Sequence, residues 1–188
     1  MKLRYLSILV IIISIVLITS ACNLKDSDNV ENQIMKKVPF PQSTNILHTE
    51  NYKDGTIILY EDQTGFRADF FSIKDDYFSG GGNANGNPKD GFNWTMRNSP
   101  KIPLVLFAGV ITDEEIKEVI VKQKTLKRNA KIIEINEGKR IWFTTFDVLE
   151  KADNGKSDPL KIEAYDNEGN MYWKDGIYEE GYFYGRTK

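Results

Sequence analysis

The chain of 188 residues contains only one cysteine and one histidine. A single cysteine excludes an intramolecular disulfide, and with a single histidine it excludes a zinc site built from Cys and His ligands. The chain also has no excess of positive charge, because it contains 25 Lys and Arg and 27 Asp and Glu, for a formal net charge of −2. This balance argues against a nucleic-acid-binding surface.

Apolar and aromatic residues are plentiful. They include 10 Phe, 9 Tyr and 3 Trp, and 40% of all residues are hydrophobic. A chain of this composition can bury a real core, so global disorder is not expected. The length suits one domain, with room for a small appendage.

The N-terminus has the three parts of a secretory signal peptide. Lys2 and Arg4 make a positive start, an apolar run covers residues 6–18, and small residues follow. A run of about 13 residues spans roughly 20 Å as a helix, which is shorter than the roughly 30 Å hydrocarbon core of a bilayer. We therefore interpret residues 1–21 as a signal peptide and not as part of the fold.

Cys22 directly follows these small residues. The segment Ile18-Thr19-Ser20-Ala21-Cys22 resembles the lipobox of bacterial lipoproteins, in a permissive form with Thr19 at the position where leucine is commonest. The resemblance implies that the Cys22 thiol receives a diacylglyceryl group. It also implies that a signal peptidase cuts before Cys22 and that the new N-terminus is acylated, for example with palmitate. The alternative is an uncleaved helix with Cys22 as an ordinary apolar residue.

A lipid anchor on Cys22 would decide where the protein resides. Two or three acyl chains, at about 0.8 kcal/mol per buried methylene, hold a domain stably on a membrane. The implied partners are the cell membrane and the lipoprotein-processing enzymes, with the domain on the extracytoplasmic face. Loss of Lys2 and Arg4 leaves 23 basic and 27 acidic residues, a net charge of −4. The protein itself is therefore not attracted to anionic lipids, and no later segment is apolar enough to span the bilayer.

The mature chain divides into three parts. Residues 22–37 form a tether, which is polar and flexible up to Gln33. Residues 34–38 could form a short helical turn, but Pro39 and Pro41 favour an extended segment. We expect an N-terminal β unit over residues 38–91, which ends in a mobile Gly/Asn-rich surface loop that could also act as a ligand lid. A β-sandwich follows over residues 92–188.

Strand patterns fill both β regions. Residues 55–60 and 66–72 predict a hairpin, residues 103–111 predict a strand buried on both faces, and residues 130–146 and 160–173 predict two further hairpins. Alternation along residues 66–71 assigns the side chains to two faces. One face has Phe66, Ala68 and Phe70, and the other has Arg67, Asp69 and Phe71.

The order of patterns between Pro103 and Asp175 is distinctive. An apolar strand ending in Ala108-Gly109-Val110 precedes an Ile/Val-rich strand, a Gly-turn hairpin with Trp142-Phe143 and a closing segment over residues 162–170. This order resembles the immunoglobulin-like sandwich modules of bacterial extracytoplasmic proteins. We expect a mainly β fold, an antiparallel immunoglobulin-like β-sandwich with an N-terminal β-hairpin unit. The family binds and spaces more often than it catalyses, and no functional residues transfer.

No catalytic constellation stands out. His48 is the only imidazole and Gly-x-Ser-x-Gly is absent, so we interpret His48 as a surface or capping residue. Glycoside cleavage needs two carboxyls roughly 5–10 Å apart. Adjacent strand residues such as Asp75 and Asp76 point to opposite faces, so acidic doublets are not pairs by themselves. The loops at residues 153–158 and 166–170 lack the ligand pattern of a calcium loop, and we predict neither a metal nor a cofactor.

The aromatic residues near the C-terminus are the candidate binding site. Trp173, Tyr178 and Tyr182 could form a platform for glycan rings or a partner protein, or they could close the sandwich as its last strand. We expect a lipid-anchored, non-catalytic module that binds a protein or cell-wall ligand. The alternatives are a toxin-sequestering envelope protein and a carboxylate-dependent hydrolase of envelope polymers that uses Asp75, Asp76 and Glu115.

Overall fold

A computed structural model describes residues 30–72, 74–99, 101–136 and 138–187. The predicted signal peptide and Cys22 lie outside these residues. The chain divides into two compact units, one up to Pro41 and one from Gln42 to Lys188. None of the helices in the described ranges is long and apolar enough to cross a membrane.

The first unit contains a short helix at residues 30–35. The N–H groups of Lys37 and Val38 continue it by donating to the Ile34 carbonyl. The sequence instead favoured a flexible tether up to Gln33 and an extended segment after it. Helix forms here because Glu31 and Gln33 are straight-chain residues that lose little rotamer freedom in a helix.

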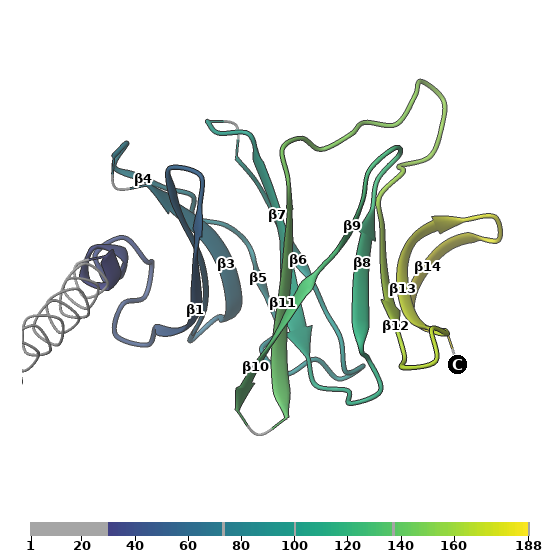
Figure 1. Cartoon of the computed structure of the whole chain (residues 1–188), viewed down its shortest axis with the longest axis horizontal. Coiled ribbons are helices and arrows are strands. Elements are labelled where there is room, and N and C mark those ends of the chain that lie inside the picture. Colours follow the sequence, from purple (N-terminus) through teal and green to yellow (C-terminus); the bar gives the residue numbers. More distant parts are fainter. Residues whose placement is uncertain (1–29, 73, 100, 137, 188) are drawn as a thin grey trace, which may run out of the picture. The chain divides into compact units, whose positions relative to one another are not determined.

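The second unit contains three antiparallel sheets (Figure 1). Sheet A has the order β1-β2-β3-β4, and β5 also pairs with β3. Its strands are β1 (Asn45–Tyr52), β2 (Gly55–Asp62), β3 (Gly65–Ser72), β4 (Tyr77–Phe78) and β5 (Asn83–Ala84).

Sheets B and C are built from the rest of the chain. Sheet B has the order β10-β11-β7-β6, from β6 (Thr95–Ser99), β7 (Leu104–Ile111), β10 (Lys131–Asn136) and β11 (Lys139–Phe146). Sheet C has the order β14-β13-β12-β8-β9, from β8 (Glu118–Lys122), β9 (Lys127–Asn129), β12 (Lys161–Tyr165), β13 (Met171–Tyr178) and β14 (Gly181–Arg186).

This strand order is that of an immunoglobulin fold. In sheet B, the spatial order β6-β7-β11-β10 corresponds to immunoglobulin strands A, B, E and D. In sheet C, the order β13-β12-β8-β9 corresponds to strands G, F, C and C′. The mainly β, antiparallel sandwich predicted from the sequence is therefore confirmed. In addition to these strands the protein has β14, which adds a fifth strand to sheet C.

Strand β7 packs against both neighbouring sheets, which places sheet B in the middle of the stack. All eight residues of β7 are buried, as the continuous apolar run predicted. Even-numbered side chains enter the core between sheets A and B, and odd-numbered ones enter the core between sheets B and C. The first set is Leu104, Leu106, Ala108 and Val110, and the second is Val105, Phe107 and Ile111. The alternation predicted for β3 is confirmed too, because Phe66, Ala68 and Phe70 lie in the first core.

The core between sheets B and C is rich in aromatic rings. Phe92 stacks on Trp142 with centroids 5.5 Å apart, and its ring lies 4.5 Å from that of Trp173. Trp142 Nε1 donates to the Asn93 carbonyl at 3.2 Å across Gly109. A Cβ atom at Gly109 would come within 2.0 Å of that carbonyl oxygen, so only glycine fits there.

Candidate functional site

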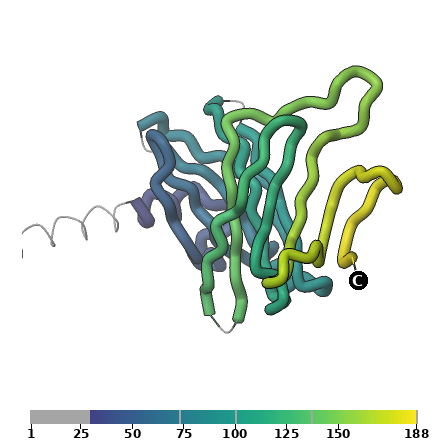
Figure 2. The backbone as a smooth tube through the Cα atoms, turned by 45° about the vertical axis from the view of Figure 1, so that its right-hand side comes forward, coloured from purple at the N-terminus to yellow at the C-terminus, as the bar shows by residue number. Residues whose placement is uncertain are grey.

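The C-terminal hairpin, β13–β14, turns one face toward the interior of the sandwich. Trp173, Asp175 and Ile177 lie opposite Arg186, Tyr184 and Tyr182 in the register, so these six residues share that face. Trp173 is fully buried, whereas 54% of Tyr184 and 69% of Tyr182 is exposed. Sheet B has four strands against the five of sheet C, and we attribute the exposure to the additional edge strand β14. Figure 2 shows this hairpin in yellow.

Two hollows lie along this face and meet at Trp94. The first has a volume of about 260 Å³, and we name it the aromatic hollow. Its lining includes Trp94, Asp158, Leu160, Asp175, Ile177 and Tyr182. The second, the loop hollow, has a volume of about 350 Å³ and is lined by residues that include Trp94, Tyr184, Asn85, Pro88, Asp90 and Asn93. Together they form a surface that we call the Trp94 groove.

Trp94 is held in a fixed position between the hollows. Its indole Nε1 donates to Asp175 Oδ2 at 2.7 Å, and its ring centroid lies 6.1 Å from that of Phe107. The preceding residue, Asn93, is only 7% exposed. Asn93 Oδ1 accepts the Val110 N–H at 2.9 Å, and Asn93 Nδ2 donates to the Asn85 carbonyl at 2.5 Å. The segment that presents Trp94 is therefore tied to β7 and to the Gly/Asn-rich loop.

The Gly/Asn-rich loop borders the groove and is fastened at its far end. The Gly91 carbonyl accepts the Thr112 N–H at 2.9 Å. Arg186, the last residue of β14, donates from Nε to the Asp90 carbonyl at 3.2 Å and pairs through Nη2 with Asp113 at 2.5 Å. These contacts connect the loop to the hairpin that supplies the tyrosines. Partial burial and the charge of Asp175 raise the pKa of Tyr182 and Tyr184, so both phenols stay neutral and can donate hydrogen bonds.

The outer face of the same hairpin is organised around Glu163, whose side chain is 3% exposed. Glu163 pairs with Lys122 at 2.5 Å and accepts the hydroxyls of Tyr165 at 2.5 Å and Tyr178 at 3.2 Å. Burial opposes its ionisation, but the hydrogen bonds from Lys122 and Tyr165 outweigh burial and lower the pKa of Glu163. Lys174 Nζ lies 4.3 Å from the ring centroid of Tyr178. Tyr178 is thus part of a closed structural network.

The three predicted aromatic residues are therefore not brought together. Trp173 lies in the core, Tyr178 lies on the outer face, and Tyr182 lines the aromatic hollow. Sequence reasoning did not single out Trp94 or Asp175. Alternation along the last strand could have grouped Tyr182 with Tyr184, but nothing local connects Trp94 to a residue 81 positions later.

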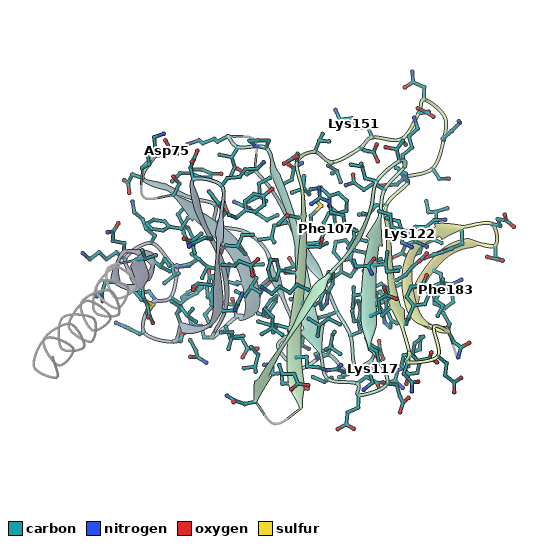
Figure 3. All side chains as sticks on the ribbon, in the orientation of Figure 1. Asp75, Phe107, Lys117, Lys122, Lys151 and Phe183 are labelled. Carbon is teal, nitrogen blue, oxygen red and sulfur yellow. The ribbon has the colours of Figure 1, made fainter. Side chains whose placement is uncertain are left out.

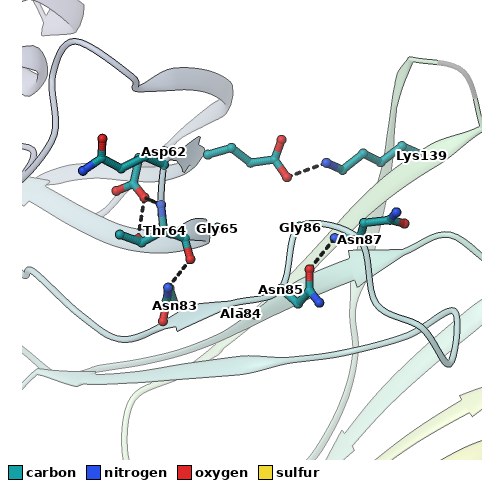
Figure 4. A pocket seen from close by; sticks show the side chains of 11 residues that line it. Asp62, Thr64, Gly65, Asn83, Ala84, Asn85, Gly86, Asn87 and Lys139 are labelled. Atoms are coloured by element: carbon teal, nitrogen blue, oxygen red, sulfur yellow. Dashed lines mark hydrogen bonds and ion pairs between the residues drawn. The ribbon is translucent and has the colours of Figure 1, made fainter.

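A second, polar cleft is lined in part by the Gly/Asn-rich loop (Figure 4). This amide cleft has a volume of about 700 Å³ and is formed by residues 61–65, residues 83–87 and Lys139. Lys139 forms an ion pair with Glu61 on one wall. Thr64 N donates to Asp62 Oδ1 at 2.7 Å, and Asn87 N donates to Asn85 Oδ1 at 2.9 Å. The lining contains no aromatic or large aliphatic residue.

Of the carboxylates predicted for hydrolysis, Asp75 and Asp76 lie in one turn, and Glu115 lies in a different connection. Asp75 lies in the turn between β3 and β4, where it accepts the Ser72 hydroxyl at 2.9 Å. Glu115 lies in the connection from β7 to β8. Figure 3 shows Asp75 and Lys117, two residues after Glu115, on opposite sides of the view. His48 is half-buried, with Nε2 3.3 Å from Glu50 Oε2.

Another buried carboxylate, Asp69 on β3, lies outside these hollows and is fully inaccessible. The Tyr60 hydroxyl donates to its Oδ2 at 2.8 Å, and within the described ranges its Oδ1 has no hydrogen-bond partner. Burial raises the pKa of Asp69 to about 6, although the Tyr60 hydrogen bond and the Arg97 charge oppose the rise. Such a group affects stability and not ligand contact.

The sequence matches no protein-family model, and searches of curated proteins and of solved structures return no significant match. The geometry of the described residues is therefore the basis for a function.

Proposed function

We propose that this chain is a lipid-anchored extracytoplasmic protein that binds a cell-wall or protein ligand in the Trp94 groove without converting it. The observation that carries the proposal is the pair of exposed tyrosine rings beside a fixed tryptophan, lining two adjoining hollows. The sequence around Cys22 supports the anchor.

The groove is suited to binding because its parts are already ordered. Immobilising a side chain on binding costs about 0.5–1.5 kcal/mol, and Trp94 is immobilised beforehand by Asp175. Tyrosine and tryptophan offer a large contact area together with a polar group, which is why they dominate binding hot spots. Asp175 adds an acceptor beside the rings, and Asn93 fixes the segment between the hollows.

A binding test follows from this arrangement. The full-length lipoprotein in detergent would be incubated with purified peptidoglycan sacculi, and bound protein would be measured after sedimentation. We expect Trp94→Ala and Tyr182→Ala to weaken binding at least tenfold. Tyr178→Phe is the matched control, because it changes an aromatic residue of the same hairpin on the outer face and should bind like the parent protein.

If a panel of envelope proteins and sacculi shows no binding, or if the groove variants bind as well as the parent protein, the proposal is rejected. The anchor has its own test. Fatty-acid labelling in cells should mark the parent protein and not Cys22→Ala, and an unlabelled parent protein would reject lipidation.

A second candidate is the carboxylate-dependent hydrolase of envelope polymers. It is favoured by one observation, namely that Asp158 and Asp175 line the same aromatic hollow. Two carboxyl groups across a glycan bond are what glycoside hydrolysis requires. Turnover of cell-wall glycans that disappears in both Asp158→Asn and Asp175→Asn, but persists in Asp75→Asn and Glu115→Gln, would support it. Absence of turnover in the parent protein would reject it.

A further inference from the structure

We propose that the ligand of the Trp94 groove is an elongated, uncharged glycan chain that continues past Asn85 into the amide cleft. This inference rests on the proposed function and specifies the ligand of the same site. It gives a role to the Gly/Asn-rich loop, which supplies Ala84 and Asn85 to both the loop hollow and the amide cleft.

Neighbouring hollows share lining residues and so form a continuous surface. The aromatic hollow and the loop hollow share Trp94. The loop hollow and the amide cleft share Ala84 and Asn85. The amide cleft in turn shares Glu61 and Lys139, among others, with a further cleft of about 480 Å³. Four hollows in succession suit a polymer that touches each of them, whereas a compact ligand would fill one.

The chemistry along this track changes from aromatic to amide. At one end, the rings of Trp94, Tyr182 and Tyr184 offer faces on which the C–H groups of sugar rings can pack. At the other end, amide side chains both donate and accept hydrogen bonds, as hydroxyl and acetamido groups require. Within the described ranges, the side-chain amides of Gln63 and Asn87 have no hydrogen-bond partner and line the cleft.

Charge along the track argues for an uncharged chain. Lys139 is paired with Glu61, and Arg186 is paired with Asp113. Lys89 lines the loop hollow and forms no ion pair within the described ranges, but Asp90 in the same lining offsets its charge. An anionic polymer would need unpaired cations, because phosphate contacts are made by Lys and Arg. A protein ligand would need an apolar centre along its interface, which the amide cleft does not supply.

The aromatic end and the amide end of the track are fixed relative to each other. Asn93, next to Trp94, donates to the Asn85 carbonyl at 2.5 Å. At Gly86 a Cβ atom would lie 2.6 Å from Glu61 Oε1, so the loop passes close against the wall of the amide cleft. The spacing between the aromatic and amide ends is therefore set before a ligand arrives, which lowers the entropic cost of binding a long chain.

Binding affinity as a function of chain length tests the inference. The full-length protein in detergent would be titrated calorimetrically with uncharged β-1,4-linked oligosaccharides of two and six units, made of N-acetylglucosamine, glucose or mannose. We expect a hexamer to bind at least tenfold more tightly than the corresponding dimer. Asn87→Ala and Gln63→Ala should remove most of that gain and leave dimer binding unchanged, while Tyr182→Ala should weaken binding of both lengths.

Asn154→Ala provides the matched control, since it removes an exposed amide from the loop before β12 and should leave both affinities unchanged. Equal affinities for dimer and hexamer, with Tyr182 still required, would overturn the elongated track and leave the proposed function standing. Wild-type hexamer affinity in Asn87→Ala and Gln63→Ala would overturn it in the same way. If none of the hexamers bind, a glycan ligand is rejected, and binding of a protein at the groove would then be the form in which the proposed function survives.

Discussion

The two faces of the β13–β14 hairpin both contain tyrosines, but the environments of these tyrosines differ. On the outer face, Tyr178 donates its hydroxyl to Glu163, and Lys174 lies over the rings of Tyr178 and Phe183. On the inner face, Tyr182 and Tyr184 are exposed beside the Trp94 groove. The difference shows that residue type does not decide whether a tyrosine is structural. What decides it is whether neighbouring side chains on the same face of the sheet bind its hydroxyl and cover its ring.

Buried and exposed side chains of the hairpin contribute differently to stability. Side chains that are already buried contribute to the free energy of unfolding, at about 25 cal/mol per Å² of apolar area removed from water. Exposed rings contribute little of this kind. Variants at buried and at exposed positions of the hairpin should therefore separate into those that change stability and those that change binding.

The largest expected effect is at Trp173, where the inner face meets the core. Trp173→Ala should lower the free energy of unfolding by about 3–5 kcal/mol, because it opens a cavity between Phe92 and Tyr184. Urea denaturation followed by circular dichroism would measure it. Trp173→Phe should cost much less, since within the described ranges the indole N–H has no hydrogen-bond partner to lose. A Trp173→Ala variant within about 1 kcal/mol of the parent protein would show that Trp173 is not a core residue.

The next effect comes from Asp69, a buried carboxylate that lacks the full set of partners that Glu163 has. Its folded-state pKa of about 6 lies above the ordinary aspartate value of 3.8, so between these pH values the folded state holds a proton that the unfolded state has released. The contribution of this group is therefore present at low pH and is lost as pH rises from about 4 to 6, by on the order of 3 kcal/mol. In Asp69→Asn this loss should disappear from urea titrations between those pH values. A parent protein and variant with parallel curves would contradict the assignment.

Glu163 should show the opposite dependence on pH. Its pKa is lowered in the folded state, so its contribution is present above the unfolded-state value near 4.5 and is lost as pH falls below it. Glu163→Gln should lower the free energy of unfolding at pH 7 by about 1–3 kcal/mol, because Lys122 and Tyr178 lose a charged acceptor. Stability of the variant should also decline less between pH 5 and pH 3. Identical acid limbs for variant and parent would contradict the role given to Glu163.

The smallest effects on stability belong to the groove tyrosines. Tyr182→Ala should stay within about 0.5 kcal/mol of the parent protein, as substitutions at exposed sites do. Tyr184→Ala should cost about 1 kcal/mol, because the Tyr184 ring packs edge-on to Trp173 at 5.1 Å. Thermal unfolding would rank the two. A large loss of stability in Tyr182→Ala would move this residue from the binding surface to the core.

Much of the fold could be predicted because strand signals are local. Alternation placed Phe66, Ala68 and Phe70 on one face of β3, and the uninterrupted apolar run identified β7 as a strand covered on both sides. Both features follow from the two-residue period of a β-strand and need no knowledge of distant parts of the chain.

The candidate site could be predicted only in part, because it depends on contacts that the sequence does not encode locally. The crowding of aromatic residues near the C-terminus indicates Tyr182, but its exposure belongs to its place on the edge strand β14, which the sequence does not reveal. The bond from Trp94 to Asp175 joins a residue before the first strand of the sandwich to one near the end of the chain. The helix at residues 30–35 was also missed, since two nearby prolines outweighed the helix-forming residues in the prediction.

The shared strand β7 has a consequence for mistakes in folding. A slip of one residue against its neighbours would exchange every side chain between the two cores at once. Phe107 would then point toward sheet A, and Gly109 would no longer lie next to Trp142, where only glycine fits. Alternative pairings of this strand are thus penalised twice, and the correct alignment is selected by two independent packing surfaces on a single segment of backbone.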